Sequence, residues 1–324
     1  VNVSSGATLR LSAGDVTGYN TGADRVSTIN LNGGTLSVNT TANQTLGSAV
    51  INMTGATVTG IASSNLDVFG GSSAINTLAS ATASTISGTK INLRQNNGLV
   101  ITVADGSAAN DLTISSVISN SSGFTNNILT KAGAGNLVLS GTNTYTTGTT
   151  LAAGTLTLDY STNNTTKLAD ASALTFGAGT STLALSGGSH TEVVASTTLS
   201  AGATANITRP SGTSVIQLGT ITVGANSNLN LAASGIATTN NTNTNGMLGA
   251  WATVGTDWAM NSTNAANGPI TAYTGYINYT RLSSGTKAIA NNAADNVRIQ
   301  DGTGTGAKAL KRPVAGKTGT SAEH

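Results

Sequence analysis

The most regular pattern in the chain is a short alternation of apolar and polar residues that follows a glycine. It is clearest in the stretch 129–158, where residues 137–139 (LVL) and 156–158 (LTL) are separated by a polar run rich in Thr, Asn and Gly. Successive side chains of a β-strand point to opposite faces, so each alternation predicts a strand with one buried face. Because strands of this length cannot bury that face alone, we expect them to stack on one another.

Variants of this pattern recur along the chain at an interval typical of stacked repeats. The separation of Leu9 from Leu36 equals that of Leu156 from Leu183, and it lies in the range of roughly 20 to 50 residues that indicates a solenoid. No helical periodicity is visible between residues 1 and 234. We therefore predict an all-β fold, a right-handed parallel β-helix (β-solenoid). The side chains expected to point inward in columns are Leu9, Leu11, Leu36, Val38, Leu137, Leu139, Leu156, Leu158, Leu183, Leu185, Leu229 and Leu231.

The chain divides into three regions that differ in residue pattern and composition. Residues 1–234 are uniform short alternations, and we predict a β-solenoid with degenerate repeats there. Coils of about 20 to 25 residues would give about ten turns, and about 4.8 Å per strand layer gives a rod on the order of 50 Å long. We predict that residues 235–287 form an aromatic-rich cap or edge module and that residues 288–324 form an irregular basic tail.

Aromatic residues gather in the region 235–287. Both tryptophans and three of the six tyrosines lie there. The open end of a solenoid must be covered, and large side chains cover the most surface per residue, which favours a cap. The alternative is a platform on which sugar rings stack, with Trp251, Trp258 and Tyr273 as the glycan-stacking residues.

The stretch 129–158, LTKAGAGNLVLSGTNTYTTGTTLAAGTLTL, also resembles a known family. It is similar to the autotransporter-associated β-strand repeat in the passenger regions of large bacterial surface and secreted proteins. The matching residues are Lys131, Gly133, Gly135, Leu137, Leu139, Gly141, Asn143, Tyr145, Gly148, Thr149, Gly154, Leu156 and Leu158. Thr147 departs from the pattern, because a second glycine is common there, and this affects the exact turn.

This resemblance implies a β-helical segment outside the bacterial cell. We expect the matching residues to serve as structural repeat residues. No charged residue is near Asn143 or Tyr145 in the sequence, and an Asn in a turn commonly hydrogen-bonds its own backbone. We therefore expect Asn143 to be bonded within its own turn.

Composition narrows the class of protein further. Hydrophobic residues make up 38% of the chain and the net charge is +2, which excludes an intrinsically disordered chain. Charged residues make up only 8%, so Thr, Ser and Asn must cover the surface, and we expect Asn ladders between equivalent turns. Cysteine is absent, which excludes disulfides and thiolate metal sites.

Neither nucleic acid nor a membrane is an expected partner of this segment. The basic residues are concentrated in the tail, so the body offers no electrostatic footprint for nucleic acid. No apolar run approaches the roughly 18 residues that a membrane span needs. The chain begins VNVSSGATLR, without Met or a basic-then-apolar leader, and we expect a mature product or an excised fragment.

The tail contains a second resemblance. ALKRPVAGKTGTS is similar to the K-T-G box of penicillin-binding proteins, with Lys-Thr-Gly at 317–319. Acyl transfer at such a box also needs a serine followed three residues later by a lysine at a helix start. The formal matches at 87–90 and 284–287 have no amphipathic helix around them. We therefore predict a loosely attached tail from about Ala288 and no transpeptidase activity.

Side chains that could support other catalysis are few and scattered. His190 is the only internal histidine, and we predict a surface position for it. A solenoid that cleaves glycans would gather two or three carboxylates on one face, and stacking could bring together acids such as Asp105 and Asp159. We predict no catalytic residue, no metal and no cofactor.

The pattern as a whole favours a non-catalytic role. We expect a structural or adhesive passenger segment of a large bacterial secreted or surface protein, acting as a stalk, adhesin or extracellular matrix component. The alternative is a glycan-binding or glycan-cleaving β-helix. The expected partners are a host surface, a glycan, or neighbouring copies of the chain, including end-to-end self-association.

Overall fold

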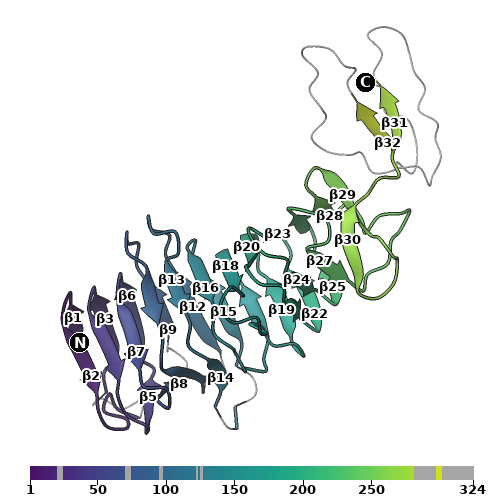
Figure 1. Ribbon diagram of the computed structural model, residues 1–324. Coiled ribbons are helices and arrows are strands. Elements are labelled where there is room, and N and C mark those ends of the chain that lie inside the picture. The colour runs from purple at the N-terminus through teal and green to yellow at the C-terminus, as the bar shows by residue number, and fades with distance from the viewer. Residues whose placement is uncertain are drawn as a thin grey trace.

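The computed structural model describes residues 1–19, 25–69, 74–94, 98–121, 123–124, 127–280 and 297–300, and for 277–280 and 297–300 only the backbone. All regular structure in these residues is β-strand, and the strands stack into an elongated body (Figure 1). The chain winds through about ten turns, so the predicted all-β parallel solenoid is confirmed.

One side of the solenoid, side A, is a ten-stranded parallel sheet with one strand from each turn. Neighbours along the sheet are paired in register from the first turn to the last. Its strands are β1 (Asn2–Ser4), β3 (Thr28–Asn32), β6 (Val50–Thr54), β9 (Ala74–Thr77), β12 (Leu99–Val103), β15 (Leu129–Ala132), β17 (Thr149–Leu151), β19 (Ala173–Phe176), β22 (Ser196–Leu199) and β25 (Thr220–Val223).

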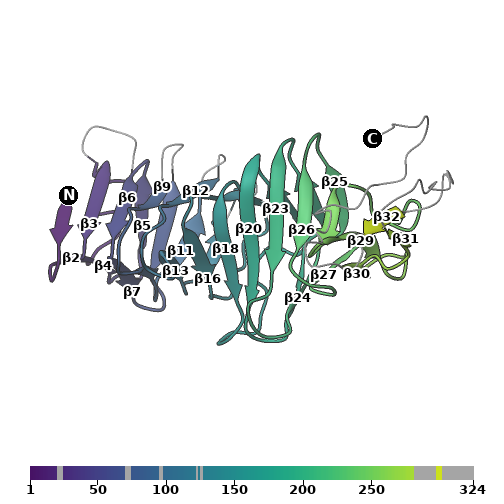
Figure 2. The same ribbon diagram turned by 90° about the horizontal axis from the view of Figure 1, so that it is seen from above.

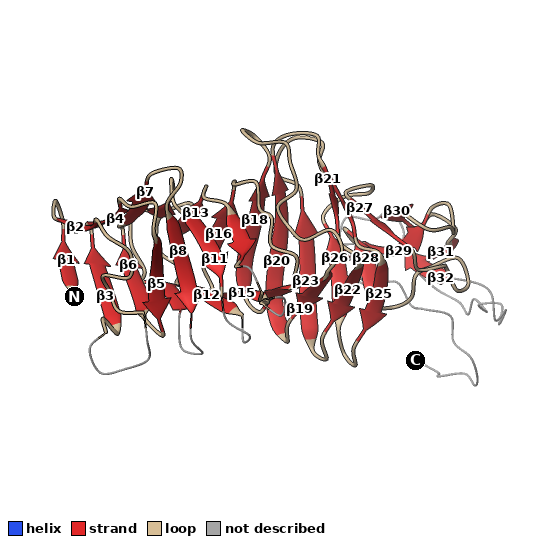
Figure 3. Ribbon diagram, turned by 90° about the horizontal axis from the view of Figure 1, so that it is seen from below, coloured by secondary structure: helices blue, strands red, loops and turns tan. Residues whose placement is uncertain are grey.

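The second side, side B, also receives one parallel strand from each turn, and its first strands lie in a row in Figure 3. Most strands of side A are joined to the next strand of side B by a short turn, commonly with a glycine, and the longest of these connections is 104–111. The strands are β2 (Thr8–Leu11), β4 (Thr35–Val38), β7 (Thr57–Gly60), β10 (Ser84–Ile86), β13 (Leu112–Ile114), β16 (Asn136–Leu139), β18 (Gly154–Asp159), β20 (Gly179–Ser186), β23 (Ala203–Thr208) and β26 (Asn228–Leu231).

The third side, side C, is interrupted. A four-stranded sheet covers turns two to five and consists of β5 (Asn43–Gly47), β8 (Asn65–Phe69), β11 (Lys90–Leu93) and β14 (Ile118–Asn120). Strands resume only in turns eight to ten, with β21 (Thr191–Val193), β24 (Val215–Gln217) and β27 (Ala237–Thr239). In the sixth and seventh turns this side is formed by the extended segment 140–148 and the loop 160–170.

The parallel stacking changes to antiparallel pairing near the C-terminal end. Strand β28 (Ala252–Val254) still pairs in parallel with β26, but β29 (Asp257–Asn261) and β30 (Gly268–Ala272) form an antiparallel meander with it. Because β30 also pairs antiparallel with β27, the meander joins sides B and C at this end. Farther on, β31 (Ile277–Thr280) pairs with β32 (Val297–Gln300), whereas residues 281–296 and 301–324, including 317–319, lie outside the described residues.

Inward-pointing side chains form the continuous core that the alternation predicted. Eleven of the twelve residues expected in columns are buried, and Leu9 is half-buried. Leu9 belongs to β2, which pairs with a neighbouring strand along one edge only, so part of its side chain stays accessible. The predicted columns are therefore confirmed, with less burial in the first turn.

An asparagine ladder runs along the outer face of side A, on the strands β1, β3, β6 and β9 that Figure 1 labels. Asn30 and Asn52 each donate from Nδ2 to Oδ1 of the Asn in the previous turn at 2.8 Å, and Asn76 does so at 3.1 Å. The sequence predicted asparagine ladders between equivalent turns. The observed ladder joins equivalent strand residues of successive coils. Parallel register places equivalent side chains about 4.8 Å apart, a distance that an amide-to-amide hydrogen bond spans well.

Candidate functional site

The stretch 129–158 forms two successive layers of the solenoid. It comprises β15 and β16, the extended segment 140–148, and then β17 and β18. Strand β16 pairs with β18 so that Leu137 lies over Leu156 and Leu139 over Leu158, and all four side chains are buried. The two alternations recognised in the sequence therefore stack directly on each other.

Lys131 is an unusual interior residue of this stretch, with only 1% of its surface exposed. Its Nζ donates to the carbonyl oxygens of Ala132 at 3.0 Å, Gly133 at 2.8 Å and Ala153 at 2.9 Å. Burial lowers its pKa to about 8, although the nearby Asp111 carboxylate acts to raise it. All three ammonium donors are thus used to tie the A-to-B turn of the sixth coil to that of the seventh.

Asn143 connects three turns on side C, where its own turn has no strand. Its Oδ1 accepts from the backbone N–H of Ile118 at 3.0 Å, and its Nδ2 donates to the carbonyl oxygen of Lys167 at 3.0 Å. The expectation that Asn143 is bonded within its own turn is therefore wrong. A buried side-chain amide can replace one residue of a β-ladder because it carries both a donor and an acceptor.

Tyr145 lies two residues farther along the same segment and is also buried. Its hydroxyl lies 2.7 Å from Oγ1 of Thr149. Burial raises the pKa of the Tyr145 hydroxyl above its ordinary value, the hydrogen bond to Thr149 opposes this, and the Glu192 carboxylate adds to it. The ring fills the interior at a point where side C provides no strand.

The glycines of this stretch permit close approach between turns. Gly133 has φ +77°, and a Cβ there would collide with the carbonyl oxygen of Val103 in the turn below. A Cβ at Gly141 would likewise collide with the carbonyl oxygen of Ser116. The other glycines of the pattern are Gly135 and Gly154, which meet backbone atoms in the same way, and Gly148, where the contact is less close.

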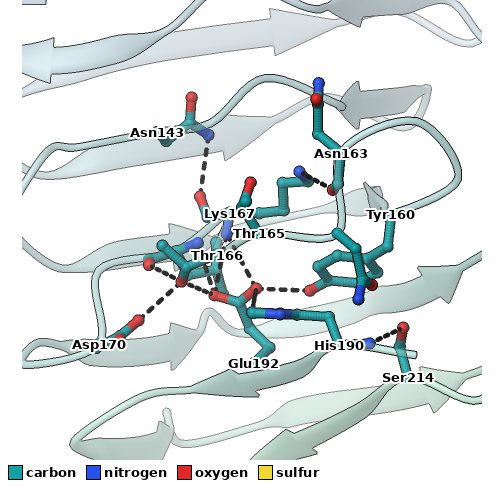
Figure 4. A network of polar contacts seen from close by, with 12 residues as sticks. Asn143, Tyr160, Asn163, Thr165, Thr166, Lys167, Asp170, His190, Glu192 and Ser214 are labelled. Carbon is teal, nitrogen blue, oxygen red and sulfur yellow. Dashed lines mark hydrogen bonds and ion pairs between the residues drawn. The ribbon is translucent and has the colours of Figure 1, made fainter. Parts of the chain in front are cut away.

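A cluster of buried polar groups follows directly, between the loop 160–170 and β21 (Figure 4). Its centre is the carboxylate of Glu192, which is fully buried. It accepts from the hydroxyls of Tyr160 at 2.6 Å and Thr166 at 2.8 Å, and from the backbone N–H groups of Lys167 at 3.0 Å and Leu168 at 2.8 Å. One side chain of β21 thereby binds four residues of the loop.

Two further ionisable side chains complete this cluster. Lys167, also fully buried, donates from Nζ to the carbonyl oxygen of Asn163 at 2.8 Å and lies 5.4 Å from the centre of the Tyr160 ring. On the Tyr160 ring packs His190, at 5.1 Å between centroids, with its Nε2 3.8 Å from Glu192. The surface position predicted for His190 is wrong, because the Tyr160 ring and Glu192 half-bury it.

Burial sets the direction of the pKa values in this cluster. It raises the pKa of the Tyr160 hydroxyl well above its ordinary value, and the negative charge of Glu192 adds to this. It lowers the pKa of Lys167, while Glu192 and Asp159 act to raise it. The sequence offered one local signal for this cluster, the buried-strand pattern around Glu192 in SHTEVV, and no signal for its distant partners.

Comparison with known families identifies the stretch 129–158. Residues 129–158 match the family model described as passenger-associated-transport-repeat. The chain contains a passenger-associated repeat. This match and the β-solenoid both fit the resemblance to an autotransporter passenger repeat protein noted in the sequence. Neither a curated protein nor a solved structure matches the chain.

The carboxylates around the passenger-associated repeat do not form an open acidic site. Asp170 and Glu192 approach the same hydroxyl, Oγ1 of Thr166, at 2.7 and 2.8 Å. Asp170 is exposed, but Glu192 is closed to solvent and its oxygens are occupied by donors of the chain itself. Asp105 follows β12 in the fifth turn and Asp159 ends β18 in the seventh, and the described ranges hold no group of three metal-ligating side chains.

An ion pair lies on side C, among the turns before the passenger-associated repeat. Asp67 is fully buried on β8 and lies 3.3 Å from Nη1 of Arg94. The Arg94 guanidinium lies 5.2 Å from the ring centre of Tyr19 and 5.4 Å from that of Phe69, and Nη2 donates to the Tyr19 hydroxyl at 2.9 Å. These four residues come from three turns, so local sequence could not have paired them.

The three proposed glycan-stacking residues lie at the far end from the first turn, around the antiparallel meander. Trp258 is buried on β29, whereas Trp251 and Tyr273 are half-buried. The Tyr273 ring meets Tyr276 edge-on at 4.9 Å, and the Tyr276 hydroxyl accepts from the backbone N–H of Trp258 at 2.8 Å. Their packing gives them a structural role here, and sugar stacking stays a prediction.

Among the described residues there is no helix long and apolar enough to cross a membrane.

Proposed function

We propose that this chain is a structural or adhesive passenger segment of a large bacterial secreted or surface protein. It acts as a stalk, adhesin or extracellular matrix component and has no catalytic role. The observation that carries the proposal is the passenger-associated repeat at 129–158, built into a continuous parallel solenoid. Two of its buried polar residues, Lys131 and Asn143, are bonded to neighbouring turns.

The distribution of the charged groups supports a non-catalytic role. General acid–base chemistry needs a carboxyl group that can reach a substrate atom. The buried carboxylates Glu192 and Asp67 are engaged by donors from their own chain. Their positions are better suited to fixing loops on side C than to contacting a substrate.

The proposed setting is the outside of a bacterial cell, and the proposed partners are a host surface, a glycan or other copies of the chain. A long body built from repeated turns has a large surface for its mass and can hold a partner far from an attachment point. Self-association would take place end to end along the rod. None of these partners needs a pocket or a cofactor.

The proposal is tested with the purified chain coupled to beads and offered to host cells and to immobilised polysaccharides. We expect retention of the beads on at least one of these surfaces, with no new reducing ends released from any polysaccharide. Release of reducing ends that grows with time would contradict the non-catalytic role. Retention no higher than that of albumin-coated beads would contradict the adhesive role and leave the stalk role.

Trp251 and Tyr273 favour the alternative, a glycan-binding β-helix, because both rings keep part of their surface accessible. If this alternative holds, Trp251→Ala lowers polysaccharide binding several-fold at a temperature at which circular dichroism shows the variant to be folded. Ile61→Ala is the matched control, since Ile61 is an exposed apolar residue in an early turn. Equal binding by both variants would remove Trp251 from the glycan site.

A further inference from the structure

The outer face of side B repeats one short motif in four consecutive turns. In each of β4, β7, β10 and β13, or directly after it, two outward hydroxyl residues flank an inward apolar residue. The pairs are Thr35 with Ser37, Thr57 with Thr59, Thr85 with Ser87, and Thr113 with Ser115.

Strand register arranges these residues in two straight rows. Thr35, Thr57, Thr85 and Thr113 are register partners of one another in turn. Ser37 is the register partner of Thr59, and the second row continues because the N–H groups of Ser87 and Ser115 donate to the strand before them at 2.9 and 3.0 Å. We call these eight residues the hydroxyl array.

The hydroxyl array has regular spacing in both directions. Neighbouring strands are about 4.8 Å apart, and residues i and i+2 of one strand are about 6.6 to 6.8 Å apart. The hydroxyls of Thr85 and Thr57 lie 3.3 Å apart, in hydrogen-bonding distance along the row. A parallel solenoid holds this spacing rigidly, because each turn is fixed by its neighbours.

The array is open and uncharged. Its eight side chains are half-buried or exposed, as expected for outward positions of central strands. The row that contains Ser37 ends at Arg10 on β2, whereas the row that contains Thr35 continues to Thr8 of the same strand. Toward β16, the Thr113 row ends at the buried Val138. From β4 to β13, these outward positions of side B therefore carry only hydroxyl and methyl groups.

We propose that the hydroxyl array binds ice. Each hydroxyl both donates and accepts, as water does, and the threonine methyl groups fill the space between the hydroxyls. The array carries no ionic group that would have to lose its hydration on contact, and because it is rigid it loses little conformational entropy on binding. An ordered water lattice presents repeated donors and acceptors at spacings of this scale, so many weak contacts form together.

This inference goes beyond the proposed function, since it requires neither a cell surface nor a glycan. The competing explanation is that the threonines serve only the sheet, because cross-strand Thr pairs stabilise neighbouring strands. A structural ladder would tolerate a bulky outward side chain without any effect on ice. Ice binding would not, because a protruding group keeps the lattice away from the array.

The test compares the full chain with Thr85→Lys, in the centre of the array, and Thr175→Lys as the matched control. Thr175 lies in a threonine row on side A, between Thr150 and Thr198, but its outward neighbours Ala173 and Gly177 carry no hydroxyl. Each protein is frozen slowly, and the fraction taken up into a growing ice hemisphere and the inhibition of ice recrystallisation are measured. Unchanged melting temperatures show that both variants keep the fold.

We expect the wild-type chain and Thr175→Lys to enter the ice and Thr85→Lys to be depleted from it several-fold. Exclusion of the wild-type chain from ice would overturn the proposal. So would an equal loss in both variants, which would place the effect outside the hydroxyl array. Retention of full ice uptake by Thr85→Lys would assign the threonine rows to sheet stabilisation alone.

Discussion

Single buried polar residues hold the parts of this solenoid where regular pairing stops. Glu192 accepts from two hydroxyls and from the backbone of the loop 160–170, and Lys131 donates to three carbonyl groups. Each of these groups is shielded from water, so its partners have no alternative if it is removed. The contribution of such a residue therefore shows mainly as the cost of deleting it.

Glu192→Ala should lower the free energy of unfolding by about 3 to 5 kcal/mol, because it leaves the Tyr160 hydroxyl and the backbone N–H groups of Lys167 and Leu168 without their acceptor. Asp170→Ala is the control, since Asp170 is exposed on the same loop, and a change within about 0.5 kcal/mol is expected for it. Urea unfolding followed by circular dichroism gives both values. Both carboxylates contact the Thr166 hydroxyl. Similar losses in the two variants would therefore mean that the loop stabilises the fold through Thr166 alone.

Lys131 should make stability rise with pH in the alkaline range. Its folded-state pKa is about 8 against an ordinary 10.5, so between these values the unfolded chain binds the additional proton. Stability then increases with pH by up to about 3 kcal/mol across that window. Lys131→Met should lack this rise. Urea midpoints compared between pH 7.5 and 9.5 test it, below the range in which exposed tyrosines ionise, and parallel curves for the two proteins would refute it.

At the scale of strands and turns, local alternation decides which residues face inward, and side chains decide how side C closes. The strands of sides A and B alternate regularly, so Leu137, Leu139 and their equivalents could be placed from sequence by period alone. Side C could not, because its strands give way to irregular segments at 140–148 and 160–170. The partners of Glu192 lie 24 to 32 residues away along the chain, and only the stacking of turns brings them together.

The Asn143 bridge gives the prediction that belongs to this scale. Asn143→Ala removes partners from the N–H of Ile118 and the carbonyl of Lys167, at about 1 to 3 kcal/mol for each buried group left unpaired. Amide hydrogen exchange at Ile118 should accelerate more than exchange in β24, three turns away. Thr142→Ala, at an exposed neighbouring position, serves as the control, and equal exchange in both variants would show that the bridge contributes little.

At the scale of the whole molecule, the antiparallel meander β28–β30 covers the strands β26 and β27 of the tenth turn. Uncovered parallel edges are templates for pairing with other chains. We therefore propose that the meander is the part of region 235–287 that limits growth of the solenoid at this end.

Deletion of residues 242–324 should expose the edges of β26 and β27 and produce concentration-dependent association. Size-exclusion chromatography with light scattering measures the mass of each particle. The deletion variant is expected to form dimers or larger species, whereas the full chain is expected to form smaller particles. Deletion of 288–324 alone keeps the meander and should leave the mass per particle unchanged. A monomeric chain after the larger deletion would show that the meander is not needed to protect this end.

The interruption of side C gives the rod an uneven resistance to stretching. The strands lie across the long axis (Figure 2), so the hydrogen bonds between turns run along it and carry a pulling force in series. Around the sixth and seventh turns two ladders bear that load, whereas three bear it in turns two to five. A tether of this kind lengthens in steps at its two-ladder layers before it breaks elsewhere. Single-molecule pulling would detect the first extension at these layers, and simultaneous yielding of all turns would contradict it.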